Sequence, residues 1–310
     1  MKQLDFDTII LGGGPAGLSA GIYSARGAVS TAIVDKNMFG GQPSNYLELE
    51  NYPGFPIVGG YDLMEKIEEH ADKFGIQKFP MQEIEKVDLI SKKIYTKEYE
   101  FSAKTIIIAT GAQPMKLGVK CEKEFVGRGV SYCAVCDGAF YKNKVVAVIG
   151  GGNSAIEEAM YLTKFASKVF VVHRRNELRA DKIIQERAFK NEKIEFVWNN
   201  VVKEINGENT VNSVVLEDVK TGKQTDLTVD GVFPYIGIVP NTEDFNGQLM
   251  QDKKGFIITD ETMATSINGV FAVGDVRNTP LRQVVTAVSD GAIGAVHAVK
   301  YIETLQNELI

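Results

Sequence analysis

The chain has 310 residues, of which 44% are hydrophobic and 24% are charged. This composition is typical of a globular protein, and the length predicts about two domains. The net charge of −6, with acidic and basic residues interspersed, predicts no nucleic acid partner and no membrane partner. Asp5 and Asp7 stand where an export signal would be basic and then apolar, so we expect a cytoplasmic protein.

The first predicted elements are a buried strand, a helix and a second strand, over residues 6–11, 16–26 and 31–35. Gly12, Gly14 and Gly17 lie in the loop that joins the first strand to the helix. Glycines at this spacing permit a tight turn and let a pyrophosphate approach the helix N-terminus. Asp35 ends the second strand, where a carboxylate accepts hydrogen bonds from a ribose diol. This unit therefore predicts an FAD site.

The next stretch is predicted to hold an amphipathic helix over residues 61–74 and a small antiparallel ribbon over residues 84–101. A further apolar strand over residues 105–109 is followed by Gly111 and Pro114. The pattern 105–114 recurs at 232–240, where Gly237 and Pro240 follow a strand, and both glycine and proline are offset by 126 (237 − 111 and 240 − 114). Each half of the chain is thus expected to complete its sheet in the same way.

Cys133 and Cys136 form a Cys-x-x-Cys pair. The chain has three cysteines, which is a small and odd number, whereas a secreted disulfide framework uses more cysteines in an even number. A zinc site would need about four ligands. Cys121 and the scattered His70, His173 and His297 provide no second pair at metal spacing, so we predict a redox dithiol and no metal. Asp137 follows the pair and can donate a proton or orient a donor, although a helix N-cap or turn role is the alternative.

A second glycine fingerprint, Gly150, Gly152 and Ala155, lies 138 residues after the first (150 − 12). It joins a predicted strand, helix and strand over residues 145–149, 154–165 and 168–173. At the position equivalent to Asp35, this copy carries a basic cluster of His173, Arg174, Arg175 and Arg179. Guanidinium groups suit a 2′-phosphate, so the second unit predicts an NADPH site, with a solvated basic helix start as the alternative.

The last predicted elements are a strand over residues 269–273, a turn at Gly274 and Asp275, and a helix over residues 283–305. No third fingerprint accompanies them, so they are expected to complete the first domain. The predicted fold class is α/β, with two Rossmann-like nucleotide-binding domains, the second inserted into the first. The predicted FAD domain covers 1–116 and 245–310, and the predicted NADPH domain with its dithiol covers 117–244.

Taken together, nine motifs resemble those of bacterial low-molecular-weight thioredoxin reductase. They are Gly12–Gly17, Gly40–Gln42, Asn51–Gly54, Ala109–Gly111, Cys133–Gly138, Gly150–Ala155, His173–Arg179, Gly274–Asp275 and Arg282–Val284. The resemblance implies a homodimer that reduces thioredoxin with electrons from NADPH through FAD. It further implies that Cys136 lies nearer the flavin, that Cys133 exchanges with the protein substrate, and that Asp137 supplies the proton.

The resemblance also implies which residues bind the cofactors. The FAD residues would be Gly12, Gly14, Ala16, Gly17, Asp35, Gly41, Gln42, Asn51, Val87, Thr110, Gly111, Gly274, Asp275, Arg282, Gln283 and Val284. The NADPH residues would be Gly152, Asn153, Ser154, His173, Arg174, Arg175, Arg179, Ile236 and Gly237. Asp275 would bond the ribityl chain, Gln42 and Asn51 would line the flavin cavity, and Asp35 and the Val87 backbone would meet the adenine end.

Three other functions stay open at this point. The partner could be a glutaredoxin-like or peroxidase-linked dithiol protein, since the sequence carries no readable docking motif. The chain could bind nucleotides without turnover, although Cys133, Cys136 and Asp137 are all present and argue against this. It could be a flavin reductase that serves ferredoxin or flavodoxin, but such an enzyme needs no dithiol.

Overall fold

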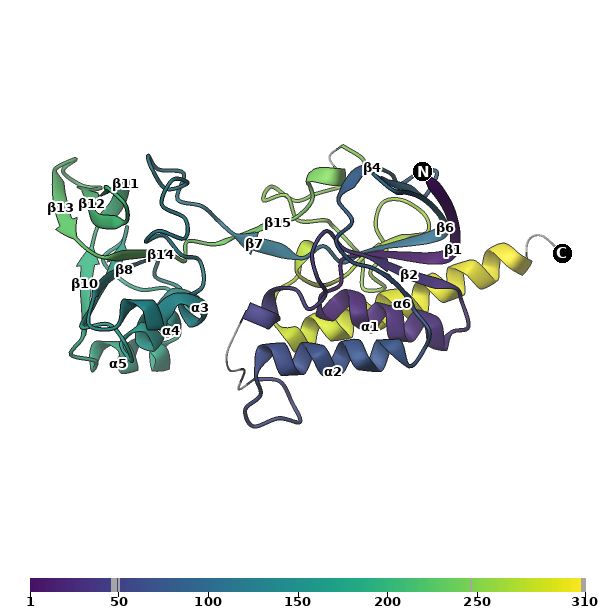
Figure 1. The fold of residues 1–310 in the computed structure, drawn as a ribbon, viewed down its shortest axis with the longest axis horizontal. Coiled ribbons are helices and arrows are strands. Elements are labelled where there is room, and N and C mark those ends of the chain that lie inside the picture. The colour runs from purple at the N-terminus through teal and green to yellow at the C-terminus, as the bar shows by residue number, and fades with distance from the viewer. Residues whose placement is uncertain (46–48, 50, 246, 308–310) are drawn as a thin grey trace. The chain divides into compact units, whose positions relative to one another are not determined.

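The structure is a computed structural model of the chain, and it describes residues 1–45, 49, 51–245 and 247–307. The chain divides into two compact units (Figure 1). The first unit comprises residues 1–113 and 239–310, and the second unit comprises residues 114–238. Strands β7 (Ala112–Pro114) and β15 (Ile238–Pro240) pair with each other where the chain crosses, a few residues before the boundaries predicted at 116 and 244.

The first unit is an α/β unit. Its strands are β1 (Lys2–Leu11), β2 (Thr31–Val34), β3 (Gln77–Phe79), β4 (Ile84–Asp88), β5 (Lys93–Thr96), β6 (Tyr99–Ile108) and β16 (Val270–Ala272). Its α-helices are α1 (Pro15–Arg26), α2 (Gly60–Asp72) and α6 (Val284–Asn307), and its short 3-10 helices are η1 (Gln42–Asn45), η3 (Glu243–Phe245) and η4 (Gly274–Val276). The strand order β3-β2-β1-β6-β5-β4, with β16 also paired to β6, makes the sheet mixed.

Strand β6 differs from its prediction. The sequence separates a ribbon ending at 101 from a strand over 105–109, whereas the structure has one strand from Tyr99 to Ile108. Its first half pairs antiparallel with β5 and its second half pairs parallel with β16, while β1 runs parallel to it throughout. The break in the apolar pattern arises because this end of the sheet carries polar pairs, such as Lys104 with Asp7 at 2.7 Å.

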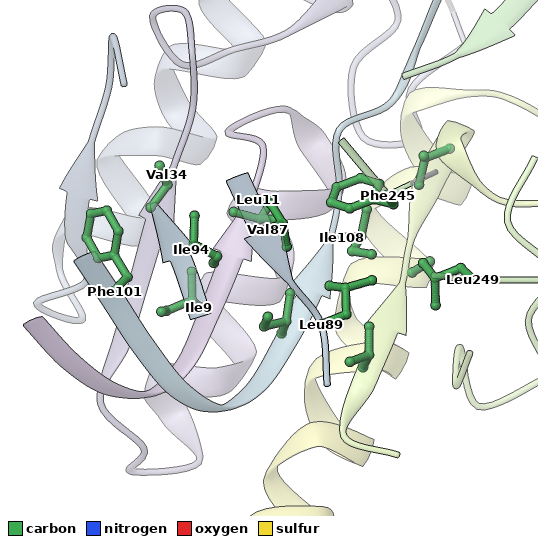
Figure 2. Close-up of a cluster of buried hydrophobic side chains, with 14 of the residues drawn as sticks. Ile9, Leu11, Val34, Val87, Leu89, Ile94, Phe101, Ile108, Phe245 and Leu249 are labelled. Carbon is green, nitrogen blue, oxygen red and sulfur yellow. The ribbon is translucent and has the colours of Figure 1, made fainter. Parts of the chain in front are cut away.

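Alternating residues of the central strands pack in two separate hydrophobic cores, because successive side chains of a strand point to opposite faces of the sheet. Ile9 and Leu11 belong to a cluster with Val87 of β4 and Phe245 of η3 (Figure 2). Ile10, between them in sequence, belongs to the cluster formed with α1, α2 and α6. The parallel strands β2, β1, β6 and β16 are therefore covered by helices on one face and by β4, β5 and the chain after η3 on the other.

The second unit repeats this layered plan. Its strands are β8 (Val145–Ile149), β9 (Lys168–His173), β10 (Ile194–Trp198), β11 (Asn200–Gly207), β12 (Val211–Asp218), β13 (Gln224–Thr228) and β14 (Gly231–Pro234). Its helices are α3 (Ala134–Asp137), α4 (Asn153–Leu162) and α5 (Lys182–Phe189), with a 3-10 helix η2 (Gly138–Tyr141). A parallel sheet β10-β9-β8-β14 packs against α3, α4 and α5 on one face and against the antiparallel sheet β11-β12-β13 on the other.

The two layered α/β units, each with parallel strands and a glycine-rich strand-to-helix loop, confirm the predicted fold class. The sequence predicts no element over residues 182–228, where the structure has α5 and β10–β13. Within the residues that the structure describes, no helix is both long enough and apolar enough to cross a membrane.

Candidate functional site

The two glycine loops are built by the same backbone contacts. Gly12 has φ +110° and donates its N–H to the Val34 carbonyl at 2.8 Å, and Gly150 has φ +153° and donates to the Val172 carbonyl at 3.0 Å. A Cβ on Gly12 would lie 2.3 Å from the carbonyl oxygen of Ala109, and one on Gly150 would lie 2.3 Å from that of Tyr235. Only glycine fits at either position, because both the backbone conformation and the close approach exclude a side chain.

Each loop leads into a helix whose first turn is open. Gly14 and Gly152 are the N-cap residues of α1 and α4, and neither helix has a side-chain cap, so its first N–H groups stay available. No atom lies within 4 Å of a Cβ built on Gly152, and the nearest to one on Gly14 is 3.8 Å away. By contrast, a Cβ on Gly17 would lie 1.8 Å from the Gly12 carbonyl oxygen. The glycines that face the strand and helix are closely packed, whereas Gly14 and Gly152 at the helix N-termini have open space beside them. This arrangement suits a bound pyrophosphate.

The strand end of the first unit is acidic. Asp35 accepts hydrogen bonds from the backbone N–H of Gly13 at 2.6 Å and of Asn37 at 2.7 Å. Burial raises the pKa of Asp35, against the lowering effect of these two hydrogen bonds and of Lys36. The carboxylate is thus fixed beside the loop, at the position where a ribose would meet it.

The strand end of the second unit is basic, but His173 lies differently from the prediction. Its ring covers the loop, within 2.5 Å of where a Cβ on Gly151 would lie, and the residue is 4% exposed. Burial lowers the pKa of His173, and the charges of Arg179, Arg175 and Arg174 lower it further. A neutral, buried imidazole packs against the loop, so the positive charge available to a ligand comes from the three exposed arginines.

The other predicted NADPH residues lie around this loop or at the crossing. Asn153 and Asp181 exchange two hydrogen bonds, Nδ2 to Oδ2 at 2.7 Å and backbone N to Oδ1 at 2.8 Å. Ser154 is exposed in the first turn of α4. Ile236 is half-buried, and Gly237, with φ +148°, accepts a hydrogen bond from the Met115 amide at 2.9 Å.

Several predicted FAD residues gather at the start of α6. The Asn51 amide donates from Nδ2 to Oε1 of Gln283 at 2.9 Å, which ties the segment after η1 to the residue before Val284. Gly41, with φ +65°, approaches the first loop, because a Cβ there would lie 3.0 Å from Cα of Gly14. Gln42 is exposed in the first position of η1. The structure therefore brings Asn51 to the start of α6 and Gly41 to the first glycine loop.

Asp275 is the predicted flavin residue with the most perturbed acidity. Burial raises its pKa to about 6, opposed by Arg282 and reinforced by Asp290. It follows Gly274, whose φ of +73° and closeness to Ala16 leave no room for a side chain, since a Cβ would lie 2.9 Å from Cβ of Ala16. The turn therefore presses directly against the first turn of α1.

Three predicted residues lie at contacts that hold the first unit together. Thr110 donates from Oγ1 to the Asn241 carbonyl at 2.7 Å and accepts from Asn241 Nδ2 at 2.8 Å, while Gly111 accepts from the Asn241 amide at 3.0 Å. The Val87 side chain is buried, and its carbonyl accepts from Gln248 Nε2 at 3.0 Å. In this structure the Val87 carbonyl therefore serves an internal contact.

The dithiol segment starts α3 in the second unit. Cys133 is disulfide-bonded and Cys121 is free. The Cys133 amide donates to Ser131 Oγ at 3.1 Å, and the next residue, Ala134, donates to the Tyr235 hydroxyl at 2.8 Å. The side chain of Cys136, the predicted second member of the pair, lies outside the described part of the chain. Tyr235 thus connects the glycine loop at Gly150 to the backbone of the dithiol helix.

Asp137 closes α3 and is half-buried, with its amide bonded to the Cys133 carbonyl at 3.2 Å. Its carboxylate lies close enough to Tyr141 to influence that phenol. Burial, then the charges of Asp137 and Asp230, raises the pKa of Tyr141 to about 12. Tyr141 therefore stays protonated at neutral pH, and Asp137 is the acidic group nearest in sequence to Cys133 that can transfer a proton.

Three residues that the sequence interpretation missed support the dithiol. Glu122 is 2% exposed and accepts from the amides of Leu117 and Gly118, at 2.8 and 2.7 Å, and from the Tyr132 hydroxyl at 2.7 Å. Tyr132 directly precedes Cys133, so the network fixes the chain that enters α3. Tyr235, the third, had a usable signal, because it is offset by 126 from Ala109 and covers its loop as Ala109 does.

Glu158, on α4, gives a testable stability prediction. Its Oε2 is buried without a hydrogen-bond partner, and burial, reinforced by Glu157, raises its pKa to about 7. The unfolded carboxyl has a pKa of 4.5 and the folded one a pKa of about 7, so this group destabilises the fold increasingly as pH rises from about 4.5 to 7, and by a constant amount above that. We expect Glu158→Gln to raise the free energy of unfolding by about 2 kcal/mol at pH 8 and by little at pH 5.

The measurement is urea unfolding followed by the fluorescence of Trp198, the chain's one tryptophan, which lies in the second unit with Glu158. Glu186→Gln, an exposed position on α5, is the matched control and should follow the wild type at both pH values. A gap between Glu158→Gln and the wild type that does not change with pH would contradict the argument.

The fold and the site together define a class: an α/β oxidoreductase with two dinucleotide loops and a disulfide-bonded cysteine. Comparison with known proteins agrees with this class. The family model described as pyridine nucleotide-disulphide oxidoreductase matches residues 6–291, and the chain belongs to this family. The enzyme is an oxidoreductase acting on a sulfur group, and the predicted cofactors are confirmed, since the family uses FAD and NADPH.

Individual relatives match over nearly their full length. The chain is 47% identical to a protein named thioredoxin reductase in Bacillus subtilis (strain 168), covering 98% of this chain and 97% of the relative. A Listeria innocua protein of the same name is also 47% identical, with 98% and 96% covered. The crystal structure of Lactococcus lactis thioredoxin reductase in its FR conformation matches with a TM-score of 0.91 and 46% identity, over 96% of this chain and 99% of that one. The resemblance inferred from the sequence motifs is therefore confirmed.

Proposed function

We propose that this chain reduces the disulfide of thioredoxin with electrons from NADPH, through FAD and the Cys133/Cys136 pair. The observation that carries the proposal is the double role of Tyr235, whose backbone covers the Gly150 loop and whose hydroxyl binds the dithiol helix at 2.8 Å. This arrangement places a disulfide-bonded cysteine in the same unit as the predicted NADPH loop. The three relatives described above are all named thioredoxin reductase, which supports the choice of substrate.

In this proposal the two glycine loops bind different cofactors. When bound, NADPH and FAD supply hydride and electron-pair transfer. The Asp35 loop would hold the flavin nucleotide, and the exposed Arg174, Arg175 and Arg179 would hold the 2′-phosphate of NADPH. Because α1 and α4 have no side-chain caps, their first backbone N–H groups are available to bind and orient the two nucleotides.

The dithiol carries the electrons onward by thiol–disulfide exchange. Two electrons and two protons convert the Cys133–Cys136 disulfide to the dithiol. The Cys133 thiolate then attacks the disulfide of thioredoxin, forming a mixed disulfide and releasing one thiol of the partner. Cys136 attacks Cys133 in turn, which releases reduced thioredoxin and restores the starting disulfide. Asp137 would donate and recover the proton that each thiolate needs.

The test is a steady-state assay of the purified FAD protein with NADPH, thioredoxin and a chromogenic disulfide. We expect NADPH oxidation that depends on thioredoxin and that is much slower with NADH. A glutaredoxin-like protein reduced far faster than thioredoxin would overturn the choice of substrate. NADPH oxidation at the full rate without any dithiol protein would instead favour a simple flavin reductase.

The homodimer and the cytoplasmic location belong to the same proposal. The family resemblance implies the dimer, and the low cysteine count favours a reducing compartment. Sedimentation of the FAD protein at micromolar concentration would distinguish a dimer from a monomer.

A further inference from the structure

The turn that carries Asp275 is held by a buried ion pair that the proposed chemistry does not use. Arg277 and Asp290 pair at 3.0 Å between Nη1 and Oδ2, and both side chains are 12% exposed. The same Oδ2 accepts the backbone N–H of Gly274 at 3.1 Å. One oxygen of Asp290, on α6, therefore bonds both ends of the turn that contains Asp275.

Arg277 is anchored on its other side as well. Its Nε donates to Thr259 Oγ1 at 2.7 Å, and its carbonyl accepts from Nη2 of Arg282 at 3.3 Å. Arg282 in turn lies over the Phe256 ring, 4.0 Å from the ring centroid. The guanidinium of Arg277 thus links α6 to the strand-like segment near Thr259, with the turn between them.

Asp290 is also fixed relative to the first glycine loop. The next residue, Gly291, packs so closely on α1 that a Cβ there would lie 2.2 Å from the Ala16 carbonyl oxygen. Ala16 is the residue that Gly274 contacts from the opposite element. The position of Asp290, the turn and the start of α1 are therefore mutually determined, and a shift of one would move the others.

Charged side chains around Asp275 have opposite effects on its pKa. Burial raises the pKa of Asp275 to about 6, Arg282 lowers it and Asp290 raises it. Arg277, bonded to Asp290, offsets the negative charge that Asp290 would otherwise place beside Asp275. An ionised Asp275 makes a stronger hydrogen bond to a hydroxyl than a protonated one does.

We propose that the buried Arg277–Asp290 pair positions the flavin-facing turn at Gly274 and Asp275 for FAD binding, with Arg277 offsetting the negative charge that Asp290 places beside Asp275. The proposal rests on the assignment of FAD to the first unit and is independent of which protein disulfide the enzyme reduces. Arg277 and Asp290 are positioning residues, because they act on the cofactor through Asp275.

The test measures the dissociation constant of FAD between pH 4.5 and 8, by flavin fluorescence on titrating the protein freed of FAD. For the wild type, we expect FAD affinity to fall as pH drops through about 6. Asp290→Asn keeps an acceptor for the Gly274 amide and removes a negative charge. The pH at which FAD affinity falls, called the break below, should therefore move down by about one pH unit. Arg277→Met leaves the Asp290 charge without its partner, so the break should move up.

Opposite shifts from two halves of one ion pair are the result that a merely structural role would not give. Arg277→Lys, which keeps the charge, should restore the wild-type break, and the double variant Arg277→Met/Asp290→Asn should lie near it even if one single variant folds poorly. Breaks that move in the same direction, or that do not move, would overturn the proposal. Failure of the wild type to bind FAD at any pH would overturn the cofactor assignment with it, whereas failure to reduce thioredoxin would leave the result intact.

Discussion

Replacing Cys136 with serine is expected to abolish reduction of thioredoxin, by at least about a thousandfold in kcat, while NADPH still reduces the bound flavin. The reason is that the serine hydroxyl cannot form the disulfide that accepts the electron pair. Anaerobic single-turnover mixing with NADPH, followed by flavin absorbance, separates the two steps. The steady-state thioredoxin assay then reports the complete cycle.

Cys121→Ser is the matched control for this experiment. Cys121 is free, and burial raises the pKa of its thiol, so it is a poor nucleophile at neutral pH. We expect this variant to keep wild-type turnover. Thioredoxin reduction that survives in Cys136→Ser would show that electrons reach the partner without the dithiol.

Removing the exposed arginines of the second unit is expected to weaken NADPH binding and to spare NADH. Each of Arg174→Gln, Arg175→Gln and Arg179→Gln should raise the Kd for NADPH by about ten- to a hundredfold, because each removes a charge-assisted hydrogen bond to phosphate. NADH lacks that phosphate, so its Kd should change little. Trp198 fluorescence is a suitable probe, since its ring lies 6.5 Å from that of His173.

The control is Arg187→Gln, an exposed arginine on α5 of the same unit. It carries the same charge change and lies away from the glycine loop in sequence, so its NADPH affinity should stay at the wild-type value. Equal losses of NADPH and NADH affinity in the three loop variants would show that the arginines do not recognise the 2′-phosphate.

The duplicated nucleotide units were predictable because their signals are local. The glycines at 12 and 150 are required by backbone contacts that recur in any unit of this kind, so spacing alone identifies them. Likewise, Asp35 differs from His173 at equivalent positions, and that difference predicts two kinds of nucleotide. The strands that adjoin these loops are buried and short, and they occur close to where the apolar runs predict them.

The position of the His173 ring could not be predicted in the same way. Spacing places a residue at a strand end, but it does not say whether the side chain points toward a ligand or folds back on the loop. The sheet β11-β12-β13 was missed for a related reason, since its strands mix buried and exposed residues and carry many charges. Their apolar residues are sorted to one face only by packing against β8 and β9.

Asp290 left a weak sequence signal. It is the single acidic residue among the positions of α6 that pack on the first unit's core, in the run Val288–Ala292. A carboxylate on such a face implies a partner, because an unpaired buried charge is costly. The partner, Arg277, lies 13 residues earlier in a turn, and no helical or strand period connects the two.

The pairing of β7 with β15 has a consequence for the history of the chain. Entry to and exit from the second unit are one hydrogen bond apart, between the Met115 amide and the Gly237 carbonyl at 2.9 Å. The first unit is therefore interrupted at one place, where the chain leaves and returns through adjacent strands as it does in a hairpin. The entropy cost of closing such a loop grows only slowly with its length. A module joined in this way can be gained, exchanged or lost in one genetic event without rebuilding the host, which gives a duplicated ancestor a route to two different coenzyme preferences in one polypeptide.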